Sequence, residues 1–259
     1  MTISFHHHMR NGDYVLNMVL EQIAQMGYKN LTVNASSVFD VHEPIIGHIK
    51  NGVVTGIECN YMGAKVGKAI SEGIMDKPVI FRSHGGRASD MEKGTSKIDI
   101  AFIAAPTSDD MGNCTGKFGK SACGSIGYAF ADAMNAKKVV VITDNLVEYP
   151  LVDFSIPEVY VDYVVAVEQI GDPAGIVSGT TKITRDPVGL KMASYAAKVI
   201  DASGLLKDGF SFQTGAGQSV LPVPSSWPRR WRKSRSRPAL PWAGSQRPLL
   251  ICTMRAWCG

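Results

Sequence analysis

Three consecutive histidines near the N-terminus are the first residues of this sequence that could bind an anion. His6, His7 and His8 follow a short apolar segment and precede Arg10. Imidazole and guanidinium groups at the start of a helix favour carboxylates and phosphates, because free backbone N–H groups point outward there. Side chains of an extended segment alternate in direction, so one or two of the histidines, but not all three, can face a ligand. The alternative is a solvated turn.

A second candidate is the segment Ser83–Arg87, with the sequence SHGGR. Gly85 and Gly86 lack side chains, which lets backbone N–H groups come close to a ligand. Arg87 can hold a carboxylate through two parallel hydrogen bonds. Because an apolar run precedes the segment, we expect it at the C-terminal end of a strand, where open α/β sheets bind ligands. An ordinary glycine turn is the alternative.

Two further segments contain closely spaced glycines. Asp109–Gly116 has the Asp, Gly and Asn residues of a tight turn, and a contact with a ligand is the alternative interpretation. In Phe212–Gly217, the amides of Gly215 and Gly217 can point at a thioester or carboxylate oxygen, as in an oxyanion hole, or the glycines simply form a turn. Phosphate-binding loops, dinucleotide fingerprints, HExxH helices and paired CxxC motifs are absent, so we expect no metal site.

Apolar patterns divide residues 1–217 into alternating strands and helices that would position these segments. The predicted strands are short apolar runs, and the predicted helices repeat apolar residues every three or four positions. This alternation predicts a doubly wound α/β fold with a mostly parallel sheet and helices on both faces. The predicted strands are Thr2–Phe5, Leu31–Val33, Val53–Ile57, Pro78–Phe81, Ile98–Ala105, Val139–Thr143 and Tyr163–Val167, and the predicted helices are Asp13–Met26, Gly63–Met75 and Pro187–Ile200.

Basic charge is concentrated at the C-terminus. The 259 residues include 27 Lys and Arg and 23 Asp and Glu, giving a net charge of +4, yet residues 218–259 hold seven Arg, one Lys and no acidic residue. With 19 basic and all 23 acidic groups, residues 1–217 carry a net charge of −4. All four tryptophans also lie in residues 218–259. We therefore predict a domain over residues 1–217 and an irregular tail over residues 218–259.

Three interpretations of the tail stay open. A basic arm with aromatic residues could grip nucleic-acid phosphates and stack on bases. A disordered extension is the second interpretation. The third is a shifted reading frame: back-translated and read one base earlier, Pro224–Lys233 permits AKFLAEKMEK, a decapeptide with good helix propensity and an apolar stripe. We favour the shifted frame, because prolines interrupt the tail and no periodicity is present.

Composition excludes several classes of protein. No apolar run approaches the roughly 20 residues that a membrane helix needs. The N-terminal segment lacks a basic start followed by an apolar core, so we expect no secretion. Five cysteines at irregular spacing indicate reduced thiols in the cytoplasm rather than a disulfide framework.

Several motifs together resemble one known family. They are TISFHHHMRNGD, IKNGVV, SHGGR, D-x-G-N-x-T-G, CGSIGYAFADAMNAKKVVVITD and GFSFQTGAG, spread over residues 2–217. Together they are similar to the alpha subunits of citrate lyase, which are citrate:acyl-carrier transferases related to the CoA-transferases. The resemblance implies the first of two domains of the CoA-transferase type, clipped at its start, in a family whose chains are considerably longer.

The resemblance also implies a cytoplasmic transferase of acetyl-CoA metabolism and citrate fermentation. Citrate would replace acetate on the thiol of an acyl-carrier gamma subunit, which supplies a CoA-like prosthetic group. A beta subunit would then cleave the citryl thioester to oxaloacetate and an acetyl thioester. No metal, nucleic acid or membrane enters this reaction. An inactive fragment, a non-catalytic folded remnant and, from the tail alone, a nucleic-acid-binding protein remain as alternatives.

Transfer of an acyl group to citrate needs oxyanion donors and a cationic clamp. Gly215 and Gly217 are the predicted oxyanion donors. We place no nucleophile on a glutamate, since this branch of the superfamily is thought to work without one. The predicted citrate contacts are a clamp of Arg87 with His84, beside Gly85 and Gly86, and secondary contacts from His7 and Arg10.

Overall fold

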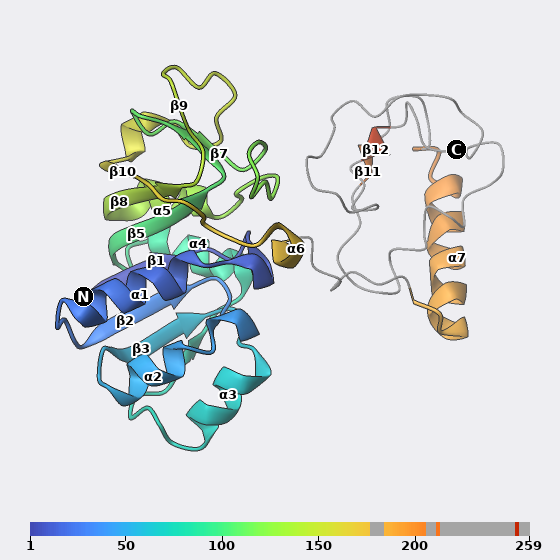
Figure 1. Ribbon diagram of the computed structural model, residues 1–259. Coiled ribbons are helices and arrows are strands. Elements are labelled where there is room, and N and C mark those ends of the chain that lie inside the picture. The colour runs from blue at the N-terminus through green and yellow to red at the C-terminus, as the bar shows by residue number, and fades with distance from the viewer. Residues whose placement is uncertain (177–183, 206–210, 213–251, 254–259) are drawn as a thin grey trace. The chain divides into compact units, whose positions relative to one another are not determined.

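Seven parallel strands form the main sheet of the computed structural model, which describes residues 1–176, 184–205, 211–212 and 252–253 (Figure 1). The strand order is β10-β8-β5-β1-β2-β3-β4, and every neighbouring pair in it is parallel. Buried apolar side chains line the inner strands, as expected for a sheet covered on both faces. The strands are β1 (Thr2–Phe5), β2 (Leu31–Ala35), β3 (Val54–Cys59), β4 (Ile80–Phe81), β5 (Ile98–Ala105), β8 (Ala136–Thr143) and β10 (Tyr163–Ala166).

Helices cover both faces of this sheet (Figure 1). Three of them, α1 to α3, lie on one face, and α4 and α5 lie on the other. The predicted doubly wound α/β fold is therefore confirmed. The helices are α1 (Val15–Gln25), α2 (Ile45–Lys50), α3 (Ala64–Ser71), α4 (His84–Glu92), α5 (Ala129–Asn135) and α6 (Pro173–Ile176), and the 3-10 turns are η1 (Arg10–Gly12), η2 (Asp40–His42) and η3 (Glu158–Tyr160).

The direction of strand addition reverses at β1. The chain adds β2, β3 and β4 on one side of β1 and then places β5 on the other side. At such a switch point the loops leaving two neighbouring strands diverge to opposite faces, which opens a crevice at the C-terminal ends of the strands. The histidine segment leaves β1 at this point, so the topology places it where ligands bind in open α/β sheets.

Several predicted elements differ from those observed. The strand predicted over Pro78–Phe81 is present but shorter: only Ile80 and Phe81 pair with β3, and both side chains are exposed at the edge of the sheet, whereas a continuous apolar run predicts burial. The predicted helix Gly63–Met75 ends at Ser71, before Gly73, which has a φ of +88°. Helices α2, α4 and α5 were not predicted, because they are short or contain glycine.

A buried aspartate builds the predicted turn after β5. The small sheet of β6 (Thr107–Asp109), β7 (Cys114–Thr115) and β9 (Leu146–Val147) carries this turn. Oδ1 of Asp109 accepts hydrogen bonds at 2.8–3.1 Å from three successive backbone amides, and Oδ2 accepts one from the amide of Leu151 at 2.9 Å. Burial raises the pKa of Asp109, but these hydrogen bonds outweigh burial and leave the pKa below its usual value. The turn prediction for Asp109–Gly116 is confirmed.

Residues beyond 177 belong to a second compact unit. The first unit is Met1–Val177 and the second is Ser178–Gly259. The described part of the second unit contains helix α7 (Pro187–Ala202) and the antiparallel pair β11 (Ser211–Phe212) and β12 (Cys252–Thr253). The boundary predicted between residues 217 and 218 lies outside the described residues and stays a prediction, as does the nature of the tail.

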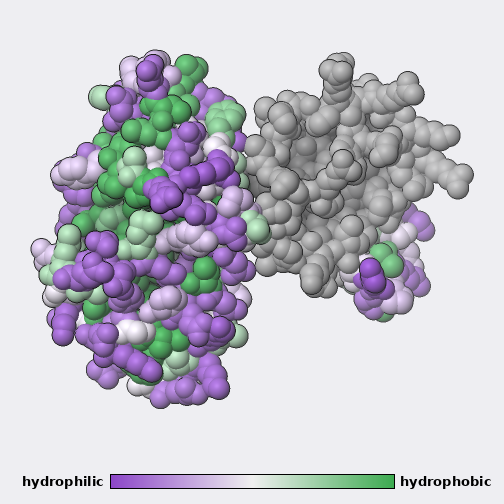
Figure 2. Space-filling view, viewed as in Figure 1, coloured by the Kyte–Doolittle hydropathy of each residue, from purple (hydrophilic) through white to green (hydrophobic). Residues whose placement is uncertain are grey.

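The surface of the first unit is not uniform. In the view of Figure 2, hydrophilic residues dominate the lower part, over α1 to α3, and hydrophobic residues are more frequent near β8, β9 and β10. Tyr163 and Val165 of the edge strand β10 are 57% and 43% exposed. Among the described residues, no helix is long and apolar enough to cross a membrane.

A glycine lets the turn η1 touch α6. A Cβ atom at Gly12 would lie 2.4 Å from the carbonyl oxygen of Asp172 and 2.6 Å from the amide nitrogen of Ile176. The amide of Asp172 donates a hydrogen bond to the carbonyl of Gly12 at 2.9 Å. The loop that follows the histidines is therefore held by backbone packing that leaves no room for a side chain.

We expect Gly12→Ala to destabilise the protein by about 1–3 kcal/mol, because the added methyl group would overlap backbone atoms. Denaturant-induced unfolding measures the effect. Gly47→Ala is the matched control: an added Cβ at Gly47, in α2, meets no atom within 4 Å, so the change should be neutral or stabilise by up to about 1 kcal/mol. Equal stability of Gly12→Ala and the unchanged protein would contradict the close approach of η1 and α6.

Candidate functional site

The three histidines after β1 come together. β1 ends at Phe5, and the chain turns directly afterwards. The ring centroid of His6 consequently lies 5.0 Å from those of both His7 and His8. The three rings gather because the strand has ended at Phe5 and the chain is no longer extended; that one or two of them, but not all three, face a ligand stays a prediction.

Two aromatic rings from other elements join these histidines. The ring of His84, the first residue of α4, lies 5.3 Å from that of His7. Tyr128, directly before α5, lies 5.9 Å from His84 and 6.3 Å from His6. We call His6, His7, His8, His84 and Tyr128 the histidine cluster. It assembles groups that leave β1, begin α4 and precede α5.

The strands on either side of β1 anchor the histidine cluster. Nε2 of His8 lies 2.6 Å from the carbonyl oxygen of Ala104 in β5. Nδ1 of His8 lies 2.8 Å from Nδ1 of His6. On the other side, the amide of His7 donates to Oγ of Ser36, which follows β2, at 3.0 Å, and Nδ1 of His7 lies 2.5 Å from the same oxygen. The rings are thus fixed to the sheet.

The segment Ser83–Arg87, predicted to contact a ligand with an ordinary glycine turn as the alternative, forms the start of helix α4. Oγ of Ser83 accepts a hydrogen bond from the amide of Gly86 at 3.0 Å and so caps the helix. The amides of His84 and Gly85 have no acceptor among the described residues. Free first-turn amides carry partial positive charge, which favours an anion beside the histidine cluster.

Arg10 adds a positive charge to this region. Its backbone has a φ of 54°, which is unusual for a residue with a side chain. Its amide donates a hydrogen bond to the carbonyl of His7 at 2.9 Å, and its charge is a lesser cause of the low pKa of His7, after burial and the neighbouring histidines. Its guanidinium has no hydrogen bond or ion pair with any residue that the structure describes. An incoming carboxylate could therefore pair with Arg10 without breaking another contact.

Arg87 is buried and already paired. Its side chain is 3% exposed, as is that of Asp132 in α5. Nη1 and Nη2 of Arg87 donate to the two carboxylate oxygens of Asp132 at 2.9 and 2.6 Å, and Nε donates to Oδ1 of Asn34 in β2 at 2.7 Å. Its bidentate carboxylate partner is therefore a side chain of the protein. Direct contact of Arg87 with a substrate stays a prediction.

Further polar contacts extend from Asn34 to the next strands. Nδ2 of Asn34 donates to Glu58 in β3 at 2.9 Å and to Ser96 at 3.0 Å. Arg82 donates to Glu58 at 2.7 Å and to Asp90 of α4 at 2.6 Å. Both ends of α4 are therefore tied to the sheet, which fixes the position of His84.

The three histidines that follow β1 are held neutral. Burial, followed by the charges of neighbouring histidines and Arg87, lowers the pKa of His6 well below its usual value. The same kinds of effect, led by burial and including Arg10, lower the pKa of His7 to about 4. Burial also lowers the pKa of His8, although its contact with Ala104 acts in the opposite direction. Near neutral pH these rings act as neutral donors and acceptors.

The structure unites most of the predicted contacts and adds others. His7 and His84 belong to the histidine cluster, Gly85 follows His84 in α4, Arg10 follows the histidines in η1, and Arg87 is buried in α4; their roles stay predictions. Gly215 and Gly217 lie outside the described residues. The sequence analysis did not select four residues of this region: Asn34, Ser36, Tyr128 and Asp132. Only Asn34 and Ser36 could have been found, because they are polar residues that follow the predicted strand Leu31–Val33.

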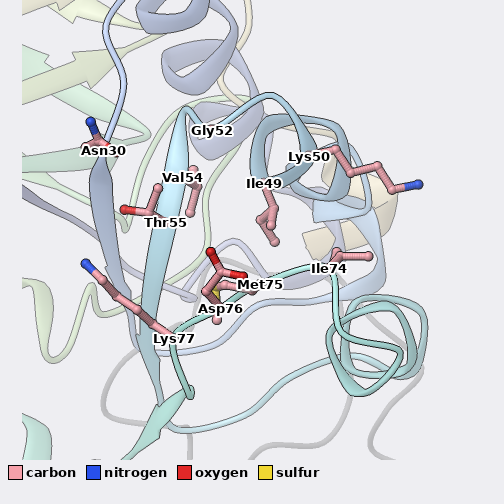
Figure 3. A pocket seen from close by; sticks show the side chains of 10 residues that line it. All are labelled: Asn30, Ile49, Lys50, Gly52, Val54, Thr55, Ile74, Met75, Asp76 and Lys77. Atoms are coloured by element: carbon pink, nitrogen blue, oxygen red, sulfur yellow. The ribbon is translucent and has the colours of Figure 1, made fainter.

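A pocket of about 450 Å³ lies away from the histidine cluster (Figure 3). Asn30 and Val54 place it at the N-terminal ends of β2 and β3, opposite the edge from which the histidines leave. The side chains of Ile49 and Asp76 point toward its centre, and that of Lys50 points away. It contains no histidine, so we place the candidate chemistry at the cluster. Among the described residues, no group of three or more His, Cys, Asp or Glu could hold a metal ion.

Asp132→Asn should destabilise the protein by about 3–5 kcal/mol, because the buried charge of Arg87 loses its partner. Chemical denaturation measures this loss. In the control Glu72→Gln, which removes the exposed partner of Lys68, stability should change by less than about 1 kcal/mol. Losses of similar size in the two variants would show that the Arg87–Asp132 pair is not buried as described.

Stability should fall as the medium is acidified below pH 6.5. The folded state lowers the pKa values of His6, His7 and His8, so below 6.5 the unfolded chain binds more protons than the folded protein. For His7, stability is lost as the pH falls from 6.5, the ordinary pKa of histidine, to about 4, the pKa of His7 in the folded protein. His7→Gln should flatten this pH dependence, measured as the free energy of unfolding at successive pH values, and the exposed control Lys29→Gln should leave it unchanged. A His7→Gln profile as steep as that of the unchanged protein would refute the assignment.

The known sequences that match this chain belong to one family. The sequence model of the family described as citrate lyase, alpha subunit (CitF), matches residues 1–237. The citrate lyase alpha chain of Haemophilus influenzae is 50% identical over 223 residues, which are 86% of this chain and 45% of the relative. That of Klebsiella pneumoniae is 47% identical over 86% of this chain and 44% of the relative. The chain therefore spans less than half the length of these curated relatives.

Solved structures agree with this result. A Streptococcus mutans structure described as an alpha subunit of citrate lyase in complex with citrate is 55% identical, with a TM-score of 0.81, over 90% of this chain and 46% of that one. An acyl-CoA transferase from Escherichia coli O157:H7 is 14% identical, with a TM-score of 0.54, over 97% of this chain and 62% of that one, and shows a shared fold alone. Sequence and structure agree that the chain belongs to the citrate lyase alpha-subunit family.

Proposed function

We propose that this chain binds citrate at the histidine cluster and forms part of a citrate:acyl-carrier transferase. The observation that carries the proposal is that clustered imidazoles, the first-turn amides of His84 and Gly85 and the side chain of Arg10, the latter two without a partner among the described residues, all belong to segments at the switch point of the sheet. Family membership supports it, since a relative with 55% identity has been solved with citrate. Citrate carries three carboxylates and one hydroxyl, and this set of donors suits them.

Arg10 and the first turn of α4 supply the positive potential. A carboxylate of citrate would accept hydrogen bonds from the amides of His84 and Gly85, and a second would pair with Arg10. His84 and His7 would add further N–H donors. Because burial lowers the pKa of His7 to about 4, its imidazole adds no charge near pH 7 and would orient the ligand through a directional hydrogen bond, while Arg10 supplies positive charge.

The proposed reaction exchanges the acid bound to a thioester. A citrate carboxylate attacks the carbonyl carbon of the acetyl thioester and expels the thiolate, and the thiolate then attacks the citryl carbonyl of the mixed anhydride and releases acetate. Bond making and breaking balance without a metal. The residues of this chain would hold and orient citrate for the attack. Holding the two reacting groups close together would supply part of the rate acceleration.

The partners proposed for the reaction are those that the family resemblance implies. An acyl-carrier gamma subunit would present the thioester on a CoA-like prosthetic group, and a beta subunit would cleave the citryl thioester in the cytoplasm. Gly215 and Gly217 would donate hydrogen bonds to the oxyanion that develops on the thioester carbonyl.

A second candidate is a folded remnant that binds citrate without turnover. It is motivated by the length of the chain, which spans 45% of a curated relative. Mixing the chain with acetyl-loaded acyl carrier and labelled citrate distinguishes the two: release of labelled citryl thioester supports the transferase, and binding without release supports the remnant. Salt-dependent binding of a DNA duplex that requires residues 218–259 would instead support a nucleic-acid-binding tail.

Arg10→Gln should weaken citrate binding by roughly tenfold or more, because a charge-assisted contact is lost. Isothermal titration calorimetry of the full chain measures the dissociation constant. Lys77→Gln is the matched control, since Lys77 lines the pocket at the opposite edge of the sheet. Citrate binding that is unaffected by Arg10→Gln, or that is lost equally in the two variants, would remove citrate from the histidine cluster.

A further inference from the structure

One buried nitrogen of the histidine cluster has no partner. Nε2 of His6 is inaccessible to solvent and makes no hydrogen bond with the residues that the structure describes. His6 as a whole is 8% exposed. Buried polar atoms in folded proteins nearly always have a partner, and exceptions often mark functional positions. The question is whether this nitrogen donates or accepts.

The hydrogen-bond chain behind His6 answers this question. The carbonyl oxygen of Ala104 can only accept, so Nε2 of His8, at 2.6 Å, carries a proton. A neutral His8 then has a lone pair on Nδ1. Nδ1 of His6, 2.8 Å away, must donate to that lone pair. A neutral His6 with its proton on Nδ1 has no proton on Nε2.

The surroundings keep both rings neutral, which this argument requires. Burial lowers the pKa of His6 and of His8, and the nearby charge of Arg87 acts in the same direction on His6. The chain of contacts from Ala104 through His8 therefore fixes a single tautomer of His6. Its free nitrogen is an acceptor on a ring that packs beside those of His7, His8 and Tyr128.

We propose that Nε2 of His6 accepts a hydrogen bond from the hydroxyl group of citrate, with His8 as the positioning residue that holds His6 in the accepting tautomer. The inference rests on the proposed function and adds to it the group that distinguishes citrate from a tricarboxylate without a hydroxyl. A carboxylate could not satisfy this nitrogen, because two lone pairs would face one another. Because this nitrogen is inaccessible to solvent in the structure, the hydroxyl reaches it only when a neighbouring group moves aside; it then donates its proton to His6 and keeps its oxygen free to accept from a neighbouring donor.

The tautomer is tested first, in the full-length chain without ligand. Nitrogen-15 NMR correlation of the imidazole rings distinguishes protonated from unprotonated ring nitrogens. We expect a protonated Nδ1 and an unprotonated Nε2 for His6 at pH 7.5. In His8→Leu, which removes the acceptor for Nδ1, the population with a protonated Nε2 should increase. A protonated Nε2 in the unchanged protein would overturn the proposal.

Ligand discrimination is tested with citrate and propane-1,2,3-tricarboxylate, which has the same carboxylates and lacks the hydroxyl. By calorimetry, the unchanged chain should bind citrate roughly tenfold or more tightly, since the second ligand leaves the buried acceptor unpaired. In His6→Phe this ratio should fall toward one, while the affinity for propane-1,2,3-tricarboxylate stays within about threefold. The control His48→Gln, a histidine outside the cluster, should keep the ratio.

The outcomes separate this inference from the proposed function. Equal binding of the two tricarboxylates by the unchanged chain overturns the role of His6 and leaves citrate binding intact. Binding of neither ligand overturns both. Equal weakening of both ligands in His6→Phe indicates a structural role and also overturns the inference. Should His6→Phe fail to fold, the NMR assignment and the affinity ratio of the unchanged chain still decide.

Discussion

The guanidinium of Arg87 is a positive charge inside the protein, and its need for partners organises the candidate site. A buried charge without a partner costs several kcal/mol, so α4, which carries Arg87, is stable only where α5 supplies Asp132 and β2 supplies Asn34. Docking in that position brings His84 and the free amides of the first turn of α4 beside the histidines that leave β1. The pair that stabilises the packing of α4 thus also places the groups proposed to bind an anion.

The same arrangement determines the protonation of the cluster. Burial is the main cause of the low pKa values of His6 and His7, and Arg87 and neighbouring rings add to it. A protonated cluster would attract any anion through charge alone, whereas a neutral one distinguishes ligands by where they place donors and acceptors. Charge then comes from Arg10, whose side chain has no partner among the described residues. On the proposed function, Arg10 would therefore supply affinity for anions, and His6 and His7 would supply selectivity among them.

The sequence predicted the sheet well because its inner strands are buried on both faces and read as continuous apolar runs, as at Ile98–Ala105. It failed for α4, where Gly85 and Gly86 lower helix propensity and only the tertiary contacts of Arg87 and Met91 stabilise the helix. Likewise, Asp132 and Tyr128 lie more than forty positions from the groups they contact in this site, and nothing local in the sequence connects them. Residue types indicated an anion site, but their arrangement depended on long-range packing.

The proposed recognition of citrate and the proposed transfer of the acyl group make different demands on this chain. Every group assigned to citrate, from His6 to Tyr128, lies in the unit Met1–Val177, directly after β1, in η1, at the start of α4 or directly before α5. The predicted oxyanion donors Gly215 and Gly217 belong to the unit Ser178–Gly259. On the proposed function, binding of citrate would depend on the packing of the first unit, through the Arg87–Asp132 pair and the contact of His8 with Ala104. Turnover would depend in addition on Gly215, Gly217 and a thioester presented by a partner, and a change in the first unit that spares binding would act through orientation of the bound acid.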